Sequence, residues 1–396
     1  MNAPDDTLRA AIVAHQAGRL AEAEVGYRRV LRKNPNDSGA LYGLGLLHYH
    51  QGSVGSALEY MSQSLQIAPS NARVWNTLGS MYSSLGREHE AKDAYERATK
   101  ASPTMSEAWY NLGICQRNEN DIDTAVGSLY AATVCDPPYL RAYEALASLL
   151  YQEGRESEAA EVYRLWIAHD PENAKARHMF AASSGEAAPA RASDDYIRQH
   201  FDASASTFDS NLKHLDYRSH EIVVAALAKA SRDPARELDS VLDAGCGTGL
   251  CGPSVRPLCK RLVGVDLSPR MIDRARLREC YDELIVSELS AFMRSRAHSF
   301  SAIVCADTLV YFGALDEPLA AARRALRANG LLAFTVEAAD SDDYRLGVTG
   351  RYSHSPDYLR RSLSEAGFAV MALSPVTLRQ ERSRDVAGIL MVAHLP

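Results

Sequence analysis

A period of 34 residues constrains the first half of this chain more than any other feature of its sequence. Prolines recur at that interval, at Pro35, Pro69, Pro103, Pro137 and Pro171. An alanine stands twelve residues before each of them, at Ala23, Ala57, Ala91, Ala125 and Ala159. Small residues let antiparallel helices approach closely, and proline cannot continue a helix. The period therefore predicts five stacked helical hairpins.

Other positions recur in the same phase. Larger residues stand eight before each proline, at Tyr27, Met61, Tyr95, Leu129 and Tyr163. Leucine and a small residue recur as Leu44-Gly45, Leu78-Gly79, Leu112-Gly113 and Leu146-Ala147. The pattern resembles the tetratricopeptide repeat (TPR), a helix–turn–helix unit of 34 residues. The resemblance implies an all-α TPR solenoid over residues 1–182, made of five repeats and a closing helix, with a concave groove.

The composition changes after the repeats. Residues 183–193 are rich in Ser, Ala, Gly and Pro, and we expect them to be a linker. Residues 194–396 then form the second predicted domain, in which 194–237 are helices before the first strand. Aromatic residues of this helical segment, Tyr196, Phe201 and Phe208, are candidates for a lid over a ligand, or else for core packing.

A glycine loop follows the first predicted strand of the second domain. The apolar run from Val241 ends at Asp243 and leads into Gly245, Gly247 and Gly249. The next apolar run ends at Asp266. Glycine permits positive φ and lets a ligand approach the backbone. A carboxylate at the tip of the neighbouring parallel strand can accept both hydroxyls of a ribose.

The spacing of these glycines separates two classes of ligand. Dinucleotide-binding sites read G-x-G-x-x-G and hold a pyrophosphate, whereas this loop reads G-x-G-x-G after a carboxylate, Asp243. A carboxylate suits an ammonium better than a phosphate, so the spacing disfavours a nicotinamide-dependent oxidoreductase. A tight turn without a ligand is the other alternative. The run D-x-G-x-G-x-G resembles motif I of the class I S-adenosylmethionine-dependent methyltransferases.

That resemblance implies an α/β fold, a doubly wound Rossmann-like sheet with a C-terminal antiparallel hairpin. Strands are expected near 241–243, 263–266, 284–289, 300–307 and 331–336. A helix with a glycine stop at Gly330 is expected before the fifth strand. Residues 366–368 and 388–393 are expected to supply the final strand pair.

The resemblance also implies S-adenosylmethionine as the cofactor. Asp243 and the glycines would frame its methionine end, Asp266 its ribose, and Glu288 its adenine, where the family more often has Asp. The expected cofactor-binding residues are Asp243, Gly245, Cys246, Gly247, Thr248, Gly249, Asp266, Leu267, Ser268, Met271, Ser287, Glu288, Leu289 and Asp307.

The acceptor side is expected just beyond the fourth and fifth strands. Methyl transfer needs the reacting atoms held in line and, for a hydroxyl or amine, a group that takes a proton. The candidates there are Asp307, Tyr311, Glu337, Tyr344, Arg345, Arg351, Tyr352 and His354. Asp307, Tyr311 and His354 form the predicted catalytic set, with His354 preferred as base because imidazole titrates near neutrality.

Two of these expectations have alternatives. His354 could instead belong to a loop before a helix that Ser355 caps and Pro356 begins. Arg345 or Arg351 could hold a carboxylate or phosphate of the acceptor. The run from Ala306 to Leu309 lacks the N-P-P-Y-like sequence of enzymes that methylate adenine or glutamine. Hydroxyl, carboxyl and carbon nucleophiles of small metabolites remain open, as does a protein recruited by the repeats.

Composition limits the partners. The net charge of −7 gives no general reason to expect nucleic acid or an anionic membrane. The first residues resemble no export signal, and no apolar run of about 18 residues could span a bilayer. Seven cysteines without paired spacing favour a reducing compartment, so we expect the cytoplasm. Cys246, Cys251 and Cys259 lack the spacing of a zinc site, and no metal is expected.

The sequence thus predicts a methyltransferase that acts on a small molecule or a protein. The whole arrangement resembles a group of bacterial proteins described as TPR-containing methyltransferases. The repeat groove would bind a protein partner, the catalytic domain or a second copy of the chain. The alternative is a TPR adaptor whose methyltransferase-like domain binds cofactor without catalysis. The expected groove residues are Tyr42, Leu46, Asn76, Ser80, Tyr110, Ile114, Arg117, Glu144 and Ser148.

Overall fold

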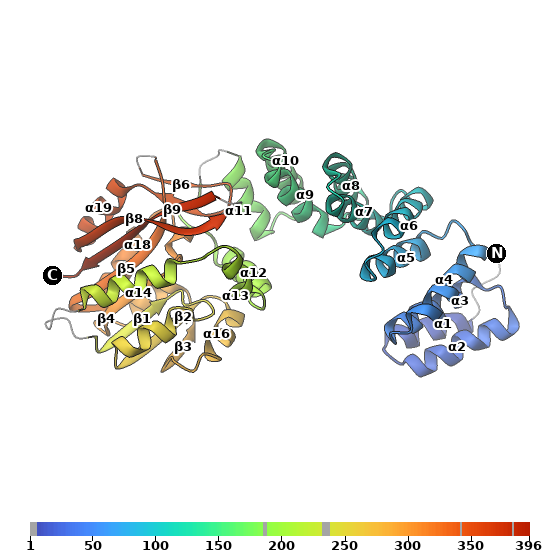
Figure 1. The fold of residues 1–396 in the computed structure, drawn as a ribbon, viewed down its shortest axis with the longest axis horizontal. Coiled ribbons are helices and arrows are strands. Elements are labelled where there is room, and N and C mark those ends of the chain that lie inside the picture. The colour runs from blue at the N-terminus through green and yellow to red at the C-terminus, as the bar shows by residue number, and fades with distance from the viewer. Residues whose placement is uncertain (1–5, 185–187, 232–237, 341–342, 382–383) are drawn as a thin grey trace. The chain divides into compact units, whose positions relative to one another are not determined.

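The computed structural model describes residues 6–184, 188–231, 238–340, 343–381 and 384–396. The chain divides into two compact units, Met1–Val162 and Tyr163–Pro396 (Figure 1). The domain limits expected from sequence, 1–182 and 194–396, remain predictions. None of the helices in the described ranges is long and apolar enough to cross a membrane.

In the described residues, ten helices follow one another from the N-terminus, in the pairs that the TPR period predicts. They are α1 (Asp6–Gln16), α2 (Leu20–Lys33), α3 (Ser38–His50), α4 (Val54–Ile67), α5 (Ala72–Ser84), α6 (Glu88–Ala101), α7 (Ser106–Asn118), α8 (Ile122–Val134), α9 (Leu140–Gln152) and α10 (Glu156–His169). The second helix of each pair ends two or three residues before its proline. The predicted all-α repeats are therefore confirmed.

Packing within the repeats explains the recurring small residues. The in-phase alanines are buried, and Ala57 and Ala91 are fully so. A Cβ added to Gly79 would lie 2.5 Å from the ring of Tyr95. Such a distance is far below van der Waals contact, so only glycine lets the two helices of this repeat approach across that ring.

The segment expected to be a linker makes specific backbone contacts where it is described. Ala190 accepts hydrogen bonds from Gly313 (2.8 Å) and Ala314 (2.9 Å), and Ala192 donates to Tyr311 (2.8 Å). Residues 185–187 lie outside the described residues. The described part of the segment therefore pairs with the loop after β4, and its expected role as a linker stays a prediction. The helices around it are α11 (Ala174–Ser183), α12 (Asp194–Ser204), α13 (Phe208–His214) and α14 (Ser219–Ala230).

One sheet, nine-stranded in the described residues, organises the second unit. Its strands are β1 (Ser240–Ala244), β2 (Arg261–Asp266), β3 (Glu283–Val286), β4 (Phe300–Cys305), β5 (Leu326–Ala338), β6 (Tyr344–Leu346), β7 (Tyr352–His354), β8 (Ala369–Glu381) and β9 (Arg384–His394). Strands β3, β2, β1, β4 and β5 are parallel neighbours in that order. Strand β9 pairs antiparallel with both β5 and β8.

Helices cover both faces of this sheet. Side chains of α14 and β1, among them Val224 and Val241, share one buried cluster, and Leu242 joins a second cluster on the opposite face. Helices on that second face are α17 (Leu289–Ser295), α18 (Asp316–Ala325) and α19 (Pro356–Glu365). Neighbouring residues of β1 thus face opposite layers, as in a doubly wound fold. The predicted fold class is confirmed.

Two local expectations differ from the structure. Helix α18 ends at Ala325 and β5 begins directly, so residues 326–330 are not a helix with a glycine stop. The chain takes its positive φ at Asn329 (61°), because asparagine tolerates the left-handed region. Residues 366–368 form the turn before β8, with Gly367 at φ 82°.

The hairpin of β6 and β7 was not anticipated. β7 pairs with Glu337 and Ala338 of β5, beyond Phe334, where the pairing of β5 with β4 ends. This extension brings Arg351, the residue before β7, to the carboxyl end of the parallel strands.

Candidate active site

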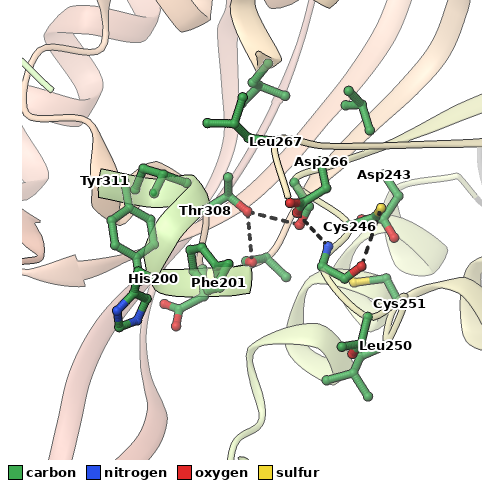
Figure 2. Close-up of a pocket in the computed structure, with 18 of the residues that line it drawn as sticks. His200, Phe201, Asp243, Cys246, Leu250, Cys251, Asp266, Leu267, Thr308 and Tyr311 are labelled. Carbon is green, nitrogen blue, oxygen red and sulfur yellow. Dashed lines mark hydrogen bonds between the residues drawn. The ribbon is translucent and has the colours of Figure 1, made fainter. Parts of the chain in front are cut away.

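A cavity lies at the carboxyl ends of β1, β2 and β4. It is lined by the glycine loop, by Asp266 and Leu267 at the end of β2, and by Asp307 and Thr308 after β4. Figure 2 shows Asp243, Cys246 and Asp266 toward one side of this cavity, with His200, Phe201 and Tyr311 toward the other. Open α/β sheets bind their ligands at this edge.

The backbone of the glycine loop needs the residues that it has. Gly245 and Gly247 have φ values of 75° and 53°. A Cβ on Gly245 would overlap Thr308, whereas a Cβ on Gly247 would meet no protein atom within 4 Å. The loop is therefore closely packed on one side and open at Gly247, which leaves space for a ligand against the backbone.

Asp266 is held at the tip of β2 by two backbone donors. Its Oδ2 accepts from the amide of Gly247 (2.9 Å) and its Oδ1 from that of Ser268 (2.8 Å). Burial raises the pKa of Asp266, and the backbone donors oppose that rise. Each carboxylate oxygen retains a lone pair, so the group can still accept hydrogen bonds from a diol.

Asp243 is buried at the end of β1, with only 1% of its surface exposed. Its Oδ2 accepts a hydrogen bond of 2.6 Å from the hydroxyl of Tyr281. Burial raises the pKa of Asp243 to about 7, and the nearby Asp266 adds to the rise. A cation bound beside this carboxyl would favour its ionised form, so the site suits an ammonium or sulfonium.

Glu288 lines the cavity and also caps α17. Its carboxylate accepts from the amides of Ser290 (2.9 Å) and Ala291 (2.7 Å). The cap fixes the side chain where β3 ends. Its expected contact with adenine remains a prediction.

Most of the expected cofactor-binding residues share this cavity. Those that line it are Asp243, Gly245, Cys246, Gly247, Thr248, Asp266, Leu267, Ser287, Glu288, Leu289 and Asp307. Gly249, Ser268 and Met271 are not among its lining residues. Ser268 caps the helix α16 (Pro269–Arg276), whose Met271 is fully buried. A Cβ on Gly249 would contact Tyr281 at 3.0 Å, so this glycine serves packing.

The predicted catalytic set divides. Asp307 and Tyr311 line the cavity, but His354 does not. His354 is fully buried, its Nε2 lies 3.1 Å from the carbonyl oxygen of Gly313, and burial lowers its pKa to about 4. Ser355 accepts a hydrogen bond from the amide of Tyr358 (3.1 Å) and caps α19. The structure therefore supports the alternative interpretation, a loop before a capped helix, and removes His354 from the acceptor side.

The arginines expected to hold an anion also lie differently. Arg345 is not among the cavity's lining residues. Arg351 lines the cavity, but its Nη1 lies 3.2 Å from Glu381 and 3.5 Å from Glu337. Tyr344 and Tyr352 pack edge to face, 6.2 Å between ring centroids, away from the cavity lining.

Sequence reasoning missed two aspartates that hold the helices α12 and α13 against the cofactor loops. Asp202 accepts a hydrogen bond from Ser268 (2.5 Å), and Asp209 accepts from Thr248 (2.5 Å). Arg278 also donates to Asp209 (2.7 Å). These partners are 39 to 69 residues apart in the chain, so no local pattern signals them.

The aromatic lid candidates separate into two groups. Phe201 and Phe208 line the cavity. Tyr196 instead stacks on His178 of α11, 4.1 Å between ring centroids, and is 3% exposed. His178 in turn lies 2.8 Å from the carbonyl oxygen of Gly350. Tyr196 is therefore a core residue that joins α11 to the β6–β7 hairpin.

Comparison with known protein families separates two regions. Residues 6–240, more than half of the chain, match the family described as the cilia and flagella-associated protein 70 C-terminal domain. Residues 242–334 match the family described as methyltransferase domain.

Similarity to individual proteins is partial. The peroxisomal targeting signal receptor of Candida albicans is 36% identical over 78 residues, 20% of this chain and 13% of the receptor. The malonyl-(acyl-carrier protein) O-methyltransferase of Enterobacter lignolyticus is 31% identical over 141 residues, 35% of this chain and 55% of the enzyme. The chain thus spans less than two thirds of either relative.

Among solved structures, one similar chain is the Burkholderia thailandensis 1,6-didemethyltoxoflavin-N1-methyltransferase with bound 1,6-didemethyltoxoflavin and S-adenosylhomocysteine. The TM-score is 0.43 at 20% identity, covering 53% of this chain and 92% of that chain. By the match over residues 6–240, the present chain belongs to the family of the cilia and flagella-associated protein 70 C-terminal domain, and its TPR repeats are followed by a region that matches the methyltransferase domain family.

Proposed function

We propose that this protein is an S-adenosylmethionine-dependent methyltransferase. The observation that carries the proposal is the convergence of three features on one cavity: buried Asp243, the open glycine loop at Gly247, and Asp266 on the neighbouring strand. These features suit the polar parts of that cofactor. The Asp243 carboxyl suits a cation, the open backbone at Gly247 leaves room for the ligand, and the Asp266 carboxylate suits the diol of the ribose.

Each part of the cofactor has residues that would hold it. Asp243 and Gly245 would take the methionine end, Asp266 the ribose, and Leu267 and Glu288 the adenine. The bound cofactor supplies a methyl group already activated on a sulfonium. Phe201 and Phe208 would exclude water from it, and Asp307 and Tyr311 would face the acceptor.

The repeat unit is proposed to be a scaffold for a protein partner or for a second copy of the chain. TPR superhelices expose a groove lined by the first helix of each repeat. Part of the expected groove is already occupied by internal bonds, since Asn76 accepts a hydrogen bond from Asn111 (3.0 Å). The seven free cysteines still favour a reducing compartment, and the cytoplasm remains the expected location.

Calorimetric titration with S-adenosylhomocysteine tests the cofactor assignment. We expect micromolar binding that Asp266→Ala weakens by about tenfold or more, because losing a charged hydrogen-bond acceptor costs about 1.5–3 kcal/mol. Asp273→Ala removes an exposed carboxylate on α16 that pairs with Arg276 at 2.8 Å, and as the matched control it should bind as the wild type does. A folded protein that does not bind would refute the proposal.

A second candidate function is an adaptor that binds the cofactor without transferring its methyl group. The family match of the TPR region, which covers more than half of the chain, supports this adaptor function. Radiolabelled methyl transfer onto proteins or metabolites captured by the full chain separates the two, because only an enzyme labels its acceptor.

A further inference from the structure

Five charged side chains meet beside the cavity, at the ends of β4, β5, β7 and β8. Arg379 contacts Asp307 at 3.4 Å and Glu381 at 2.7 Å, and it also pairs with Glu337. Arg351 contacts the same Glu337 and Glu381. A β-bulge in β8 between Thr377 and Arg379 redirects the strand there. Arg379, at the centre of the cluster, is only 1% exposed, whereas Glu381 at its outer side is 34% exposed.

The cluster holds two guanidinium groups and three carboxylates, so it carries one excess negative charge when each group has its ordinary charge. Cations that line the cavity in the described ranges are already paired, Arg351 in this cluster and Arg191 with Asp194 at 2.8 Å. An anionic acceptor would therefore meet negative charge without an unpaired cation to offset it. The arrangement disfavours a carboxylate or phosphate beside Asp307.

Asp307 is the carboxylate of the cluster that lines the cavity, and one of its oxygens is buried and unused. Its Oδ2 contacts Arg379, whereas its buried Oδ1 has no hydrogen-bond partner among the described residues. Six non-glycine residues in the described ranges have positive φ, and of these only Asp307 (55°) lines the cavity. Strained backbone and an unsatisfied buried acceptor together are typical of a residue kept for a ligand.

Aromatic side chains line the same cavity as Asp307. Phe201, Phe208, Tyr217 and Tyr311 all line it. Aromatic faces attract a cation, as a carboxylate does. The surroundings of Asp307 therefore favour a group that donates hydrogen bonds and gains positive charge during the reaction.

We propose that the methyl acceptor is an aliphatic amine whose N–H donates to Oδ1 of Asp307; this inference rests on the proposed methyltransferase function. The amine first gives one proton to water, and its neutral nitrogen then forms a bond to the methyl carbon while the carbon–sulfur bond breaks and leaves its electron pair on sulfur. The proton on nitrogen then passes to the Asp307 carboxylate. Excess negative charge and aromatic faces stabilise the cationic nitrogen between these two events.

Ligand-observed NMR on the full chain saturated with S-adenosylhomocysteine tests the substrate class. The probes are two matched fragments, phenethylamine and 3-phenylpropionate, at millimolar concentration. We expect the amine alone to bind, and Asp307→Asn to weaken it at least tenfold. Asparagine keeps the size of the side chain and tolerates positive φ, and Asp273→Asn is the exposed control.

Each outcome decides the inference. Amine binding that Asp307→Asn removes and Asp273→Asn retains supports it. Four results would overturn it: equal binding of both fragments, binding of the acid alone, no binding of either, or an amine affinity unchanged in Asp307→Asn. In each of these cases, continued binding of S-adenosylhomocysteine leaves the methyltransferase proposal intact. Loss of S-adenosylhomocysteine binding in the wild type overturns both. The comparison of fragments on wild-type protein does not depend on the variant folding.

Discussion

The two units of this protein bury different kinds of side chain. In its described residues the repeat unit buries hydroxyls and amides, such as Ser64, Asn76 and Thr99, but no charged side chain. The second unit buries Asp243 and Arg379. Burying charge is costly unless it is paired or serves a ligand. The contrast indicates that repeated packing holds the first unit together, whereas the second unit keeps costly groups around a cavity.

Glycine shows the same contrast. In the repeats Gly79 is required for its size, because it lies against Tyr95 within a regular helix. In the cofactor loop Gly245 is required for its backbone as well, since it has positive φ and lies against Thr308. A similar substitution at the two sites should therefore affect different properties, stability in one unit and ligand binding in the other.

The largest expected effect comes from Gly245→Ala. The new Cβ would overlap Thr308, and the alanine backbone would have to keep an unfavourable positive φ. We therefore expect S-adenosylhomocysteine binding to weaken about 100-fold, or ~3 kcal/mol. Calorimetry measures it. Thr308→Ala in the same chain should restore part of the affinity, because it removes the atoms nearest to the new Cβ. Binding unchanged by Gly245→Ala would erase the distinction between the two classes of glycine.

A smaller effect is expected from pH through His354. Burial lowers its pKa to about 4, whereas the unfolded chain binds this proton below about 6.5. The stability due to neutral His354 is therefore present above pH 6.5 and lost as pH falls toward 4. Between pH 7 and pH 5 the wild type should lose about 2 kcal/mol more than His354→Gln.

Urea unfolding at both pH values measures this loss. The relevant unfolding transition is that of the second unit, which is recognised because added S-adenosylhomocysteine shifts its midpoint. Other groups, including Asp243 with its raised pKa, contribute equally to both proteins and cancel in the comparison. Parallel losses in the wild type and in His354→Gln would show that buried His354 is not the source.

The smallest expected effect is in the repeats. Gly79→Ala should destabilise the unit by about 1 kcal/mol, because overpacking against Tyr95 exceeds the gain in helix propensity. Gly127→Ala, on α8 with no atom within 4 Å of the new Cβ, should instead stabilise by up to about 1 kcal/mol. Urea unfolding measures the stability of both variants, in the transition of the repeat unit, whose midpoint S-adenosylhomocysteine does not shift. A stabilising Gly79→Ala would mean that ring contact does not limit helix approach.

Local patterns account for the elements that sequence reasoning placed correctly. The period of 34 residues positions the helices, because each repeat reuses the same contacts between neighbouring helices. The strands before Asp243 and Asp266 and the glycines between them are contiguous signals, and they bring most of the expected cofactor residues to one cavity. Where the signal was weaker, as at Gly330, the chain turned at a different residue.

The sequence by itself determined the repeats, the doubly wound sheet and the motif at the cofactor loop, since each is encoded within a few turns or strands. Tertiary structure decided the acceptor side. Arg379 reaches Asp307 and Glu337 across 72 and 42 residues of chain, and His354 is buried rather than exposed to the cavity. These outcomes depend on strand register and on a bulge in β8, which packing between distant segments sets and no local period records.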